Sequence, residues 1–256
     1  MITAMWHDVH SHPQQLEDPE GALRRARECG VRLCIAGTEK PSEAAEVFAL
    51  HEKFPDMIVP AAGLHPATAT ELAEEEVKEE LRTLRELIPR LRVISEIGLD
   101  YKYAATDRQK LRQREILEEQ FALAGKHRLP VQLHSRWAQR PAMEAAMSFV
   151  KQTNVPALLH WFTASRKLVR IVNRQERLYI SVGPSVLYSE ETRRVVAEIA
   201  PDHLLLETDC PVPIGGRPNE PARAAEVARA VARIHGLAPE ELAARLKANL
   251  SDYLGM

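Results

Sequence analysis

Short apolar stretches alternate with longer segments of helical periodicity along the whole chain, and the alternation occurs eight times. The apolar stretches are rich in Val, Ile and Leu and contain few polar positions, as expected for parallel strands that are covered on both faces. The pattern therefore predicts eight buried strands, at residues 5–10, 32–37, 58–64, 93–97, 130–134, 156–160, 178–182 and 203–208.

The segments between the predicted strands have the features of surface helices. Residues 71–91 carry Glu, Lys and Arg at helical spacings, which predicts one long exposed helix. Thr106 and Gln109 match a capping box that begins a helix reaching residue 126. Pro239 stands at a favourable first position for a last helix that reaches residue 254. The chain thus reads as a series of strand–helix units.

Eight strand–helix units in 256 residues predict an α/β protein with a TIM-type (β/α)8 barrel. We expect residues 1–256 to form a single domain, because no low-complexity linker or change of composition divides the chain. An open doubly wound sheet is the alternative fold. It receives no support, because the sequence has neither a Gly-rich phosphate loop nor a dinucleotide fingerprint.

Polar residues gather at the carboxyl ends of the predicted strands, where barrel enzymes carry their chemistry. His10 and His12 end the first strand, and strand alternation points both imidazoles to one face. A single histidine at a strand end is more often an ordinary hydrogen-bonding group, but here six strand ends carry imidazole or carboxylate groups. The others are His65, Glu96, His134, His160 and Asp209.

Four imidazoles and two carboxylates can hold two divalent metal ions if one carboxylate bridges them. Glu96 lies in the middle of the barrel order and is the expected bridge. The strands that end near residues 37 and 182 provide an internal contrast, because they offer no ligand. Imidazole suits zinc or manganese, and weakly held magnesium is a further option, so the identity of the ions stays open between Zn, Mg and Mn.

Composition narrows the class of protein. Hydrophobic residues make up 45% and charged residues 27% of the chain, which excludes a disordered chain and a membrane-spanning one. The formal net charge of -2 provides no long-range attraction to nucleic acid, whereas two divalent ions beside two carboxylates create a local positive charge that can bind a phosphate. Three cysteines without a CxxC pair, and the lack of a signal sequence, predict a cytoplasmic protein with reduced thiols.

The strand-end residues belong to longer motifs. The chain carries, in order, DVHSH, GLHP, SEIGLDY, LPVQLHSR, LHWF and LLLETDCP, and then NEP at residues 219–221. In this order and spacing the motifs resemble the TatD family of metal-dependent deoxyribonucleases, a branch of the amidohydrolase superfamily. The resemblance covers essentially the whole chain.

The resemblance implies a metal-dependent hydrolase that cleaves phosphodiester bonds of DNA, as an exonuclease on single-stranded or frayed ends. It implies that Asp209 and Glu96 are catalytic, with Asp209 orienting or deprotonating the attacking water. It also implies two metal-binding sets that share one carboxylate. These are His10, His12, Glu96 and Asp209 for one ion, and Glu96, His134 and His160 for the other.

Two residues are expected to contact the substrate. Arg136 lies two residues beyond His134 and its planar guanidinium suits a phosphate, although a salt bridge at the barrel rim is the alternative. His65 would bind the phosphate or assist the leaving group. Substrate preference stays open, because four non-ligand positions depart from the family pattern. They are Trp137, Trp161, Cys210 and Pro218.

Other functions remain open from the sequence. The same metal chemistry could hydrolyse a carbon ester or a lactone, or remove a misattached aminoacyl group from transfer RNA. A non-catalytic metal-binding barrel is a further alternative, and the intact ligand set argues against it. The sequence predicts no membrane partner, and it leaves the oligomeric state open, with a monomer included.

Overall fold

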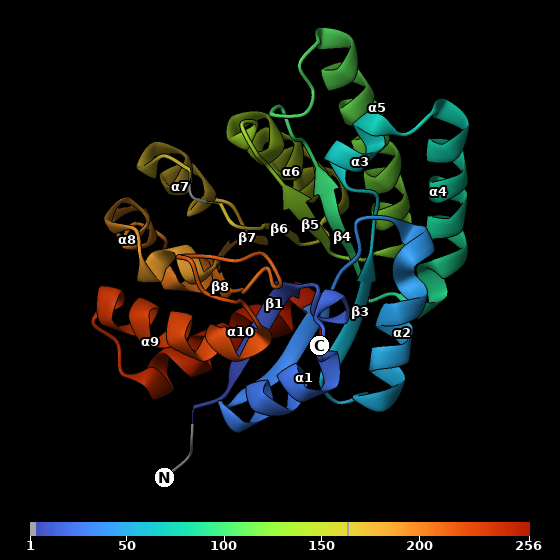
Figure 1. Cartoon of the computed structure of the whole chain (residues 1–256). Coiled ribbons are helices and arrows are strands. Elements are labelled where there is room, and N and C mark those ends of the chain that lie inside the picture. Colours follow the sequence, from blue (N-terminus) through green and yellow to red (C-terminus); the bar gives the residue numbers. More distant parts are fainter. Residues whose placement is uncertain (1–3, 163) are drawn as a thin grey trace.

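The computed structural model describes residues 4–162 and 164–256. Eight strands pair in sequential order in one parallel sheet that curls around a central axis (Figure 1). The predicted TIM-type barrel is confirmed, and each predicted strand is present with small shifts at its ends. The strands are β1 (Trp6–Ser11), β2 (Val31–Ala36), β3 (Ile58–Ala62), β4 (Val93–Gly98), β5 (Val131–His134), β6 (Ala157–Leu159), β7 (Leu178–Val182) and β8 (Leu204–Leu206).

Helices cover the outside of the barrel (Figure 1). In the described part of the chain, no helix combines the length and apolar character needed to cross a membrane. The helices are α1 (Pro19–Glu28), α2 (Ala44–Lys53), α3 (Pro66–Glu71), α4 (Glu74–Leu87), α5 (Asp107–His127), α6 (Gln139–Thr153), α7 (Arg166–Val172), α8 (Glu190–Val196), α9 (Ala224–His235) and α10 (Pro239–Leu254).

The helix predicted over residues 71–91 is present but shorter: it is α4, from Glu74 to Leu87, and Glu71 instead ends α3. Pro66 begins α3 at the favourable first position, and the α3 helix ends at Glu71. The Glu76 carboxylate then accepts a hydrogen bond from the backbone N–H of Ala73 at 2.7 Å, which fixes a new helix start. The charge pattern alone does not reveal this break, because both helices expose charged residues.

The seam between β8 and β1 closes just beyond the end of β8. The backbone N–H of Asp209 donates to the His10 carbonyl at 2.9 Å, and the N–H of His12 donates to the Cys210 carbonyl at 2.8 Å. The same residues are expected metal ligands or their neighbours. Closure of the barrel therefore fixes the backbone from which these side chains project.

Apolar side chains fill the barrel interior and its floor. Val9, Ile35 and Leu205 from the strands form one buried cluster with Leu250 and Tyr253 of α10. The Tyr253 hydroxyl is fully buried and donates to a β5 carbonyl at 3.1 Å, so this polar group is satisfied. The α10 helix thus seals the amino end of the barrel, and the polar site lies at the opposite end.

Candidate metal centre

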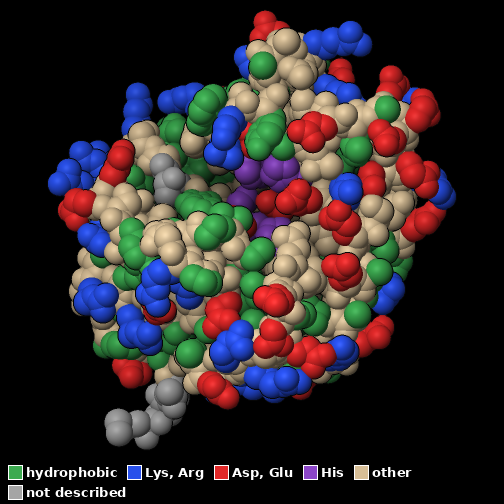
Figure 2. Space-filling view, in the orientation of Figure 1, with side chains coloured by type: hydrophobic (Ala, Val, Ile, Leu, Met, Phe, Trp, Pro, Cys, Tyr) green, Lys and Arg blue, Asp and Glu red, His purple; other side chains and the backbone are tan. Residues whose placement is uncertain are grey.

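The carboxyl ends of the strands surround an open cavity of about 810 Å³. Figure 2 shows histidine side chains at the bottom of this hollow. His10 lies fully buried beneath the cavity floor. The other expected site residues all line the cavity: His12, His65, Glu96, His134, Arg136, His160 and Asp209.

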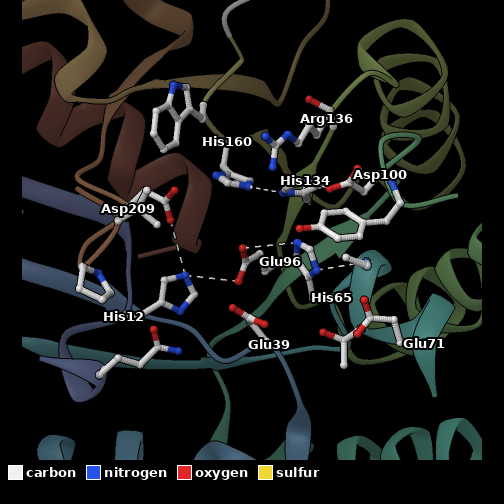
Figure 3. A pocket seen from close by; sticks show the side chains of 18 of the residues that line it. His12, Glu39, His65, Glu71, Glu96, Asp100, His134, Arg136, His160 and Asp209 are labelled. Carbon is white, nitrogen blue, oxygen red and sulfur yellow. Dashed lines mark hydrogen bonds and ion pairs between the residues drawn. The ribbon is translucent and has the colours of Figure 1, made fainter. Parts of the chain in front are cut away.

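The first expected ligand set converges on one point. One ligand atom from each of its residues lies within 4.8 Å of the others, and all four residues are buried. The Asp209 Oδ1 atom is 3.6 Å from Nε2 of His10 and 3.6 Å from Nε2 of His12. Glu96 Oε2 is 3.3 Å from His12 Nε2 (Figure 3). Two imidazoles and two carboxylates around one point match the ligand preferences of a divalent transition metal.

Hydrogen bonds on the far side of both imidazoles fix their orientation. Gln132 Nε2 donates to the Val9 carbonyl at 2.6 Å, so the Gln132 Oε1 atom, 2.7 Å from His10 Nδ1, acts as the acceptor. His12 Nδ1 likewise donates to the Gly37 carbonyl at 3.0 Å. Nδ1 of each ring therefore carries a proton and Nε2 faces the centre, where it offers a lone pair to a metal ion whenever the ring is neutral.

The second expected ligand set also converges. Ligand atoms of Glu96, His134 and His160 lie within 4.8 Å of one another. His134 Nε2 donates to Asp100 Oδ2 at 2.9 Å, which leaves His134 Nδ1 facing His160 Nε2 at 3.3 Å (Figure 3). The other Asp100 oxygen accepts a hydrogen bond from the backbone N–H of Lys102 at 2.9 Å. Asp100 thus positions His134 for a ligand role through Nδ1.

Two of the carboxylates project from an unusual backbone. Glu96 has a φ of 57° and Asp209 a φ of 52°, in the left-handed region that non-glycine residues seldom occupy. At Glu96 the β4–β5 pairing shifts register between Ile94 and Ile97, which marks a local bulge. Such features concentrate at functional sites, where they aim one side chain away from the regular alternation.

The charges in the centre fit a bound cation. Burial raises the pKa of Glu96 to about 8, although His12 opposes this shift. Burial lowers the pKa of His12, but the adjacent Glu96 and Asp209 carboxylates outweigh burial and raise it to about 10. His10 Nε2 is buried and has no hydrogen-bond partner in the described part of the chain. A divalent cation at this point would satisfy that nitrogen and replace the bound protons.

Metal binding is therefore expected to release protons. Near pH 7 the metal-free site holds one proton on His12 and one on Glu96, according to their raised pKa values. Apparent affinity for metal should rise with pH up to about pH 10, steeply below about pH 8, where Glu96 and His12 must both lose a proton, and less steeply above it, where only His12 must. Calorimetry in buffers of different ionisation enthalpy measures the protons released. Release of none would contradict the assigned protonation.

Replacing Asp100 by Asn is expected to weaken metal binding at the second ligand set by about 10- to 100-fold. The backbone N–H of Lys102 holds one side-chain oxygen, so the new amide group would point its N–H at His134 Nε2. The ring must then carry its proton on Nδ1, which removes the ligand lone pair. Metal titration checks this loss, with the exposed Asp202→Asn as control. Unchanged affinity would show that Asp100 does not set the His134 tautomer.

The structure also places the two expected substrate residues. His65 Nδ1 accepts a hydrogen bond from the Ala67 N–H at 3.1 Å, so the neutral ring presents Nε2–H to the cavity, 3.8 Å from Glu96 Oε1. A third group, His65 with Asp100 and His134, could reach one ion, but these hydrogen bonds already engage its atoms. Arg136 lines the cavity and forms no ion pair with a carboxylate of the described residues, so the rim salt bridge is absent there.

Sequence reasoning missed three residues of the site. Gln132 and Asp100 orient two of the predicted ligand histidines, and Glu39 lines the cavity although the strand before it carries no predicted ligand. Gln132 could have been found, because it is a polar residue two positions before His134 in an otherwise apolar strand. Glu39 follows its strand by three residues, and only the loop conformation brings it to the cavity.

The chain is similar to known proteins over nearly its full length. A sequence model of the family described as "TatD related DNase" matches residues 7–255. The chain is 32% identical over 254 residues to the uncharacterized metal-dependent hydrolase YjjV of Escherichia coli (strain K12), covering 94% of this chain and 95% of the relative. It is 32% identical over 248 residues to the 3'-5' ssDNA/RNA exonuclease TatD of Erwinia tasmaniensis, covering 92% and 93%.

A solved structure agrees with this assignment. The crystal structure of YJJV, described as a TatD homolog from Escherichia coli K12, matches with a TM-score of 0.83 at 28% identity, covering 99% of each chain. Together with the family match, this similarity extends over the strands that carry the ligand sets. The chain therefore belongs to the family of TatD-related DNases and is a metal-dependent hydrolase.

Proposed function

We propose that residues 1–256 act as one barrel that binds two divalent metal ions and digests DNA from single-stranded or frayed ends. The observation that carries this proposal is the position of Glu96, which belongs to both ligand sets and borders an open cavity. The Erwinia tasmaniensis relative is named as a 3'-5' exonuclease of single-stranded DNA and RNA, which supports this substrate and favours digestion from the 3′ end.

The predicted ligands form two sets, one for each ion. His10, His12 and Asp209 would hold one ion, His134 and His160 would hold the other, and Glu96 belongs to both ligand sets. Zinc, manganese or magnesium bound there would polarise the phosphoryl group and acidify a water molecule. Because hydrogen bonds on the far side hold the imidazoles of His10, His12 and His134 in place, these three rings would need little reorganisation to bind metal.

Three residues then act on the substrate. Asp209 accepts the proton of the attacking water, because its carboxylate is ionised and faces the shared centre. Arg136 holds a phosphate oxygen pair with its unpaired guanidinium. His65 donates its Nε2–H to the phosphate or to the leaving oxygen, since its Nδ1 is already engaged.

The cellular setting follows from the thiols. Cys29, Cys34 and Cys210 are free cysteines in the structure, which fits a reducing compartment. We place the enzyme in the cytoplasm, where reduced thiols persist.

The experiment uses metal-stripped protein and an end-labelled single-stranded DNA, with Mg, Mn or Zn added back separately. Stepwise shortening of the DNA that depends on one added ion supports the proposal, and the label shows which end is digested. A sample without added metal and a sample with chelator serve as controls. Intact DNA with every ion, from protein shown to be folded and metal-loaded, would contradict the deoxyribonuclease function and turn attention to ester, lactone and aminoacyl substrates.

A further inference from the structure

The cavity has two chemically different walls. Glu39, which follows β2, and Glu71, the last residue of α3, line one side of it. Arg136, which follows β5, lines the opposite side, and Figure 3 shows the two glutamates and the arginine separated by Glu96 and the histidines. Figure 2 shows the same division, with acidic side chains on the right of the histidines and hydrophobic ones on the left.

The acidic wall is not neutralised by neighbouring cations. Glu39 and Glu71 form no ion pair with a Lys, Arg or His of residues 4–162 and 164–256. The nearest lysine in sequence, Lys40, pairs instead with Glu43 at 3.0 Å. Both carboxylates are exposed and can accept hydrogen bonds from groups that enter the cavity.

The opposite wall suits an unpaired nucleic acid strand. Arg136 offers a guanidinium for a backbone phosphate. Next to it, the Trp137 side chain is 67% exposed, and Trp161 after β6 lines the cavity. Exposed aromatic rings beside a cation are the usual features that bind single strands, through base stacking and phosphate contacts. The part of the substrate that carries further phosphates therefore belongs on this wall.

If the rest of the strand lies along the wall of Arg136, the terminal group beyond the scissile phosphate lies against the acidic wall. In digestion from an end this group is a single nucleoside, which is neutral when it ends in a hydroxyl. A terminal phosphate would bring about -1.5 to -2 charges toward Glu39 and Glu71, and like charges brought together in this way strongly oppose binding. A hydroxyl instead donates a hydrogen bond to either carboxylate.

We propose that this enzyme selects DNA ends that carry a free hydroxyl, and that Glu39 and Glu71 reject ends that carry a phosphate. This selection rests on the proposed exonuclease function.

Selection of hydroxyl ends also determines which bond breaks, because each round must leave a strand that the enzyme can digest again. The water oxygen bonds to phosphorus, the bond from phosphorus to the sugar oxygen of the remaining strand breaks, and that oxygen takes a proton. The released nucleotide keeps the phosphate, and the shortened strand ends in a hydroxyl and is again a substrate.

The test compares two oligonucleotides of one sequence that differ only in a hydroxyl or a phosphate at the digested end. Wild-type enzyme is expected to digest the hydroxyl end at least about tenfold faster. In the double variant Glu39→Gln/Glu71→Gln this ratio should fall below about threefold, because the repelling charges are gone. The released product should be a nucleotide that carries the phosphate. The measured quantity is the ratio of the two digestion rates, so a change in activity that affects both oligonucleotides equally does not alter it.

A matched control separates local from overall charge. The double variant Glu86→Gln/Glu115→Gln removes the same charge from exposed positions on α4 and α5 outside the cavity and should keep the wild-type ratio. Equal digestion of both ends by the wild type would overturn the proposal, and so would a ratio that Glu39→Gln/Glu71→Gln leaves unchanged. Failure of folded, metal-loaded enzyme to digest either oligonucleotide would instead overturn the exonuclease function and this inference with it.

Discussion

Replacing Glu96 by Gln is expected to lower the hydrolytic rate by about a thousandfold or more. Glu96 is the residue that both ligand sets share. A glutamine side chain has one oxygen and an N–H2 group, so it cannot bridge two cations. Loss of the bridge removes several kcal/mol of transition-state stabilisation by the metals, which corresponds to about a thousandfold in rate.

The same substitution should have little effect on the metal-free fold. Burial raises the pKa of Glu96 to about 8, so the fold already accommodates this side chain in its neutral form. Glutamine has the same shape and carries no charge, and its backbone can keep the φ of 57° that Glu96 adopts. Thermal unfolding with and without metal distinguishes the effects: added metal should raise the Tm of the wild type far more than that of Glu96→Gln.

The control for this experiment is Glu115→Gln, an exposed change of the same chemistry on α5. It should match the wild type in rate, metal content and Tm. If Glu96→Gln kept its activity and bound two ions per chain, Glu96 would not be the bridge. A loss of activity together with a lower Tm in chelator would instead indicate that the substitution disturbs the fold.

The sequence predicts the barrel, and it also predicts which residues meet at one end of it, because two simple regularities coincide. Parallel strands covered on both faces are apolar throughout, so the polar residues at their ends stand out. Closure of the barrel brings those ends together, so ligands far apart in the chain meet, as His12 and Glu96 do at 3.3 Å. Neither regularity depends on side-chain packing, so the periodicity of the sequence alone predicts where the site lies.

The parts that could not be predicted depend on local geometry. The bulge that turns Glu96 into the centre arises from a register shift that the apolar pattern does not record. The start of α4 at Glu74, three residues later than predicted, depends on a hydrogen bond between Glu76 and the backbone of Ala73. The place of Glu39 at the cavity depends on the path of one loop. In each case several local conformations have similar free energies, and the packing of the rest of the chain determines which one forms.

Replacing Asp209 by Asn tests the second large effect, the transfer of a proton from water. Burial raises the pKa of Asp209, but the hydrogen bond from His12 and the neighbouring imidazoles outweigh burial and hold it below its ordinary value. The carboxylate is thus ionised at neutral pH and available as a base. An asparagine oxygen can still contact a metal ion, but it cannot accept the proton.

Asparagine should also fit the backbone of this position. Asn tolerates a positive φ better than most residues, and Asp209 has a φ of 52°. The residue before it is clamped, because the Asp8 carboxylate accepts hydrogen bonds from the Thr208 N–H at 2.8 Å and hydroxyl at 2.6 Å. The position of the side chain should therefore survive the substitution, and the change isolates the chemistry of the carboxylate.

We expect Asp209→Asn to lower kcat by about 10²- to 10⁴-fold at saturating metal, with little change in KM. Single-turnover digestion of DNA measures the rate, metal analysis measures occupancy, and the exposed Asp56→Asn is the control. A full rate would exclude Asp209 as the base. A fall in rate that added metal restores would make Asp209 a ligand alone, and the proton would then have to leave through another residue at the cavity. Only a loss of kcat that persists with both ions bound assigns the proton to Asp209.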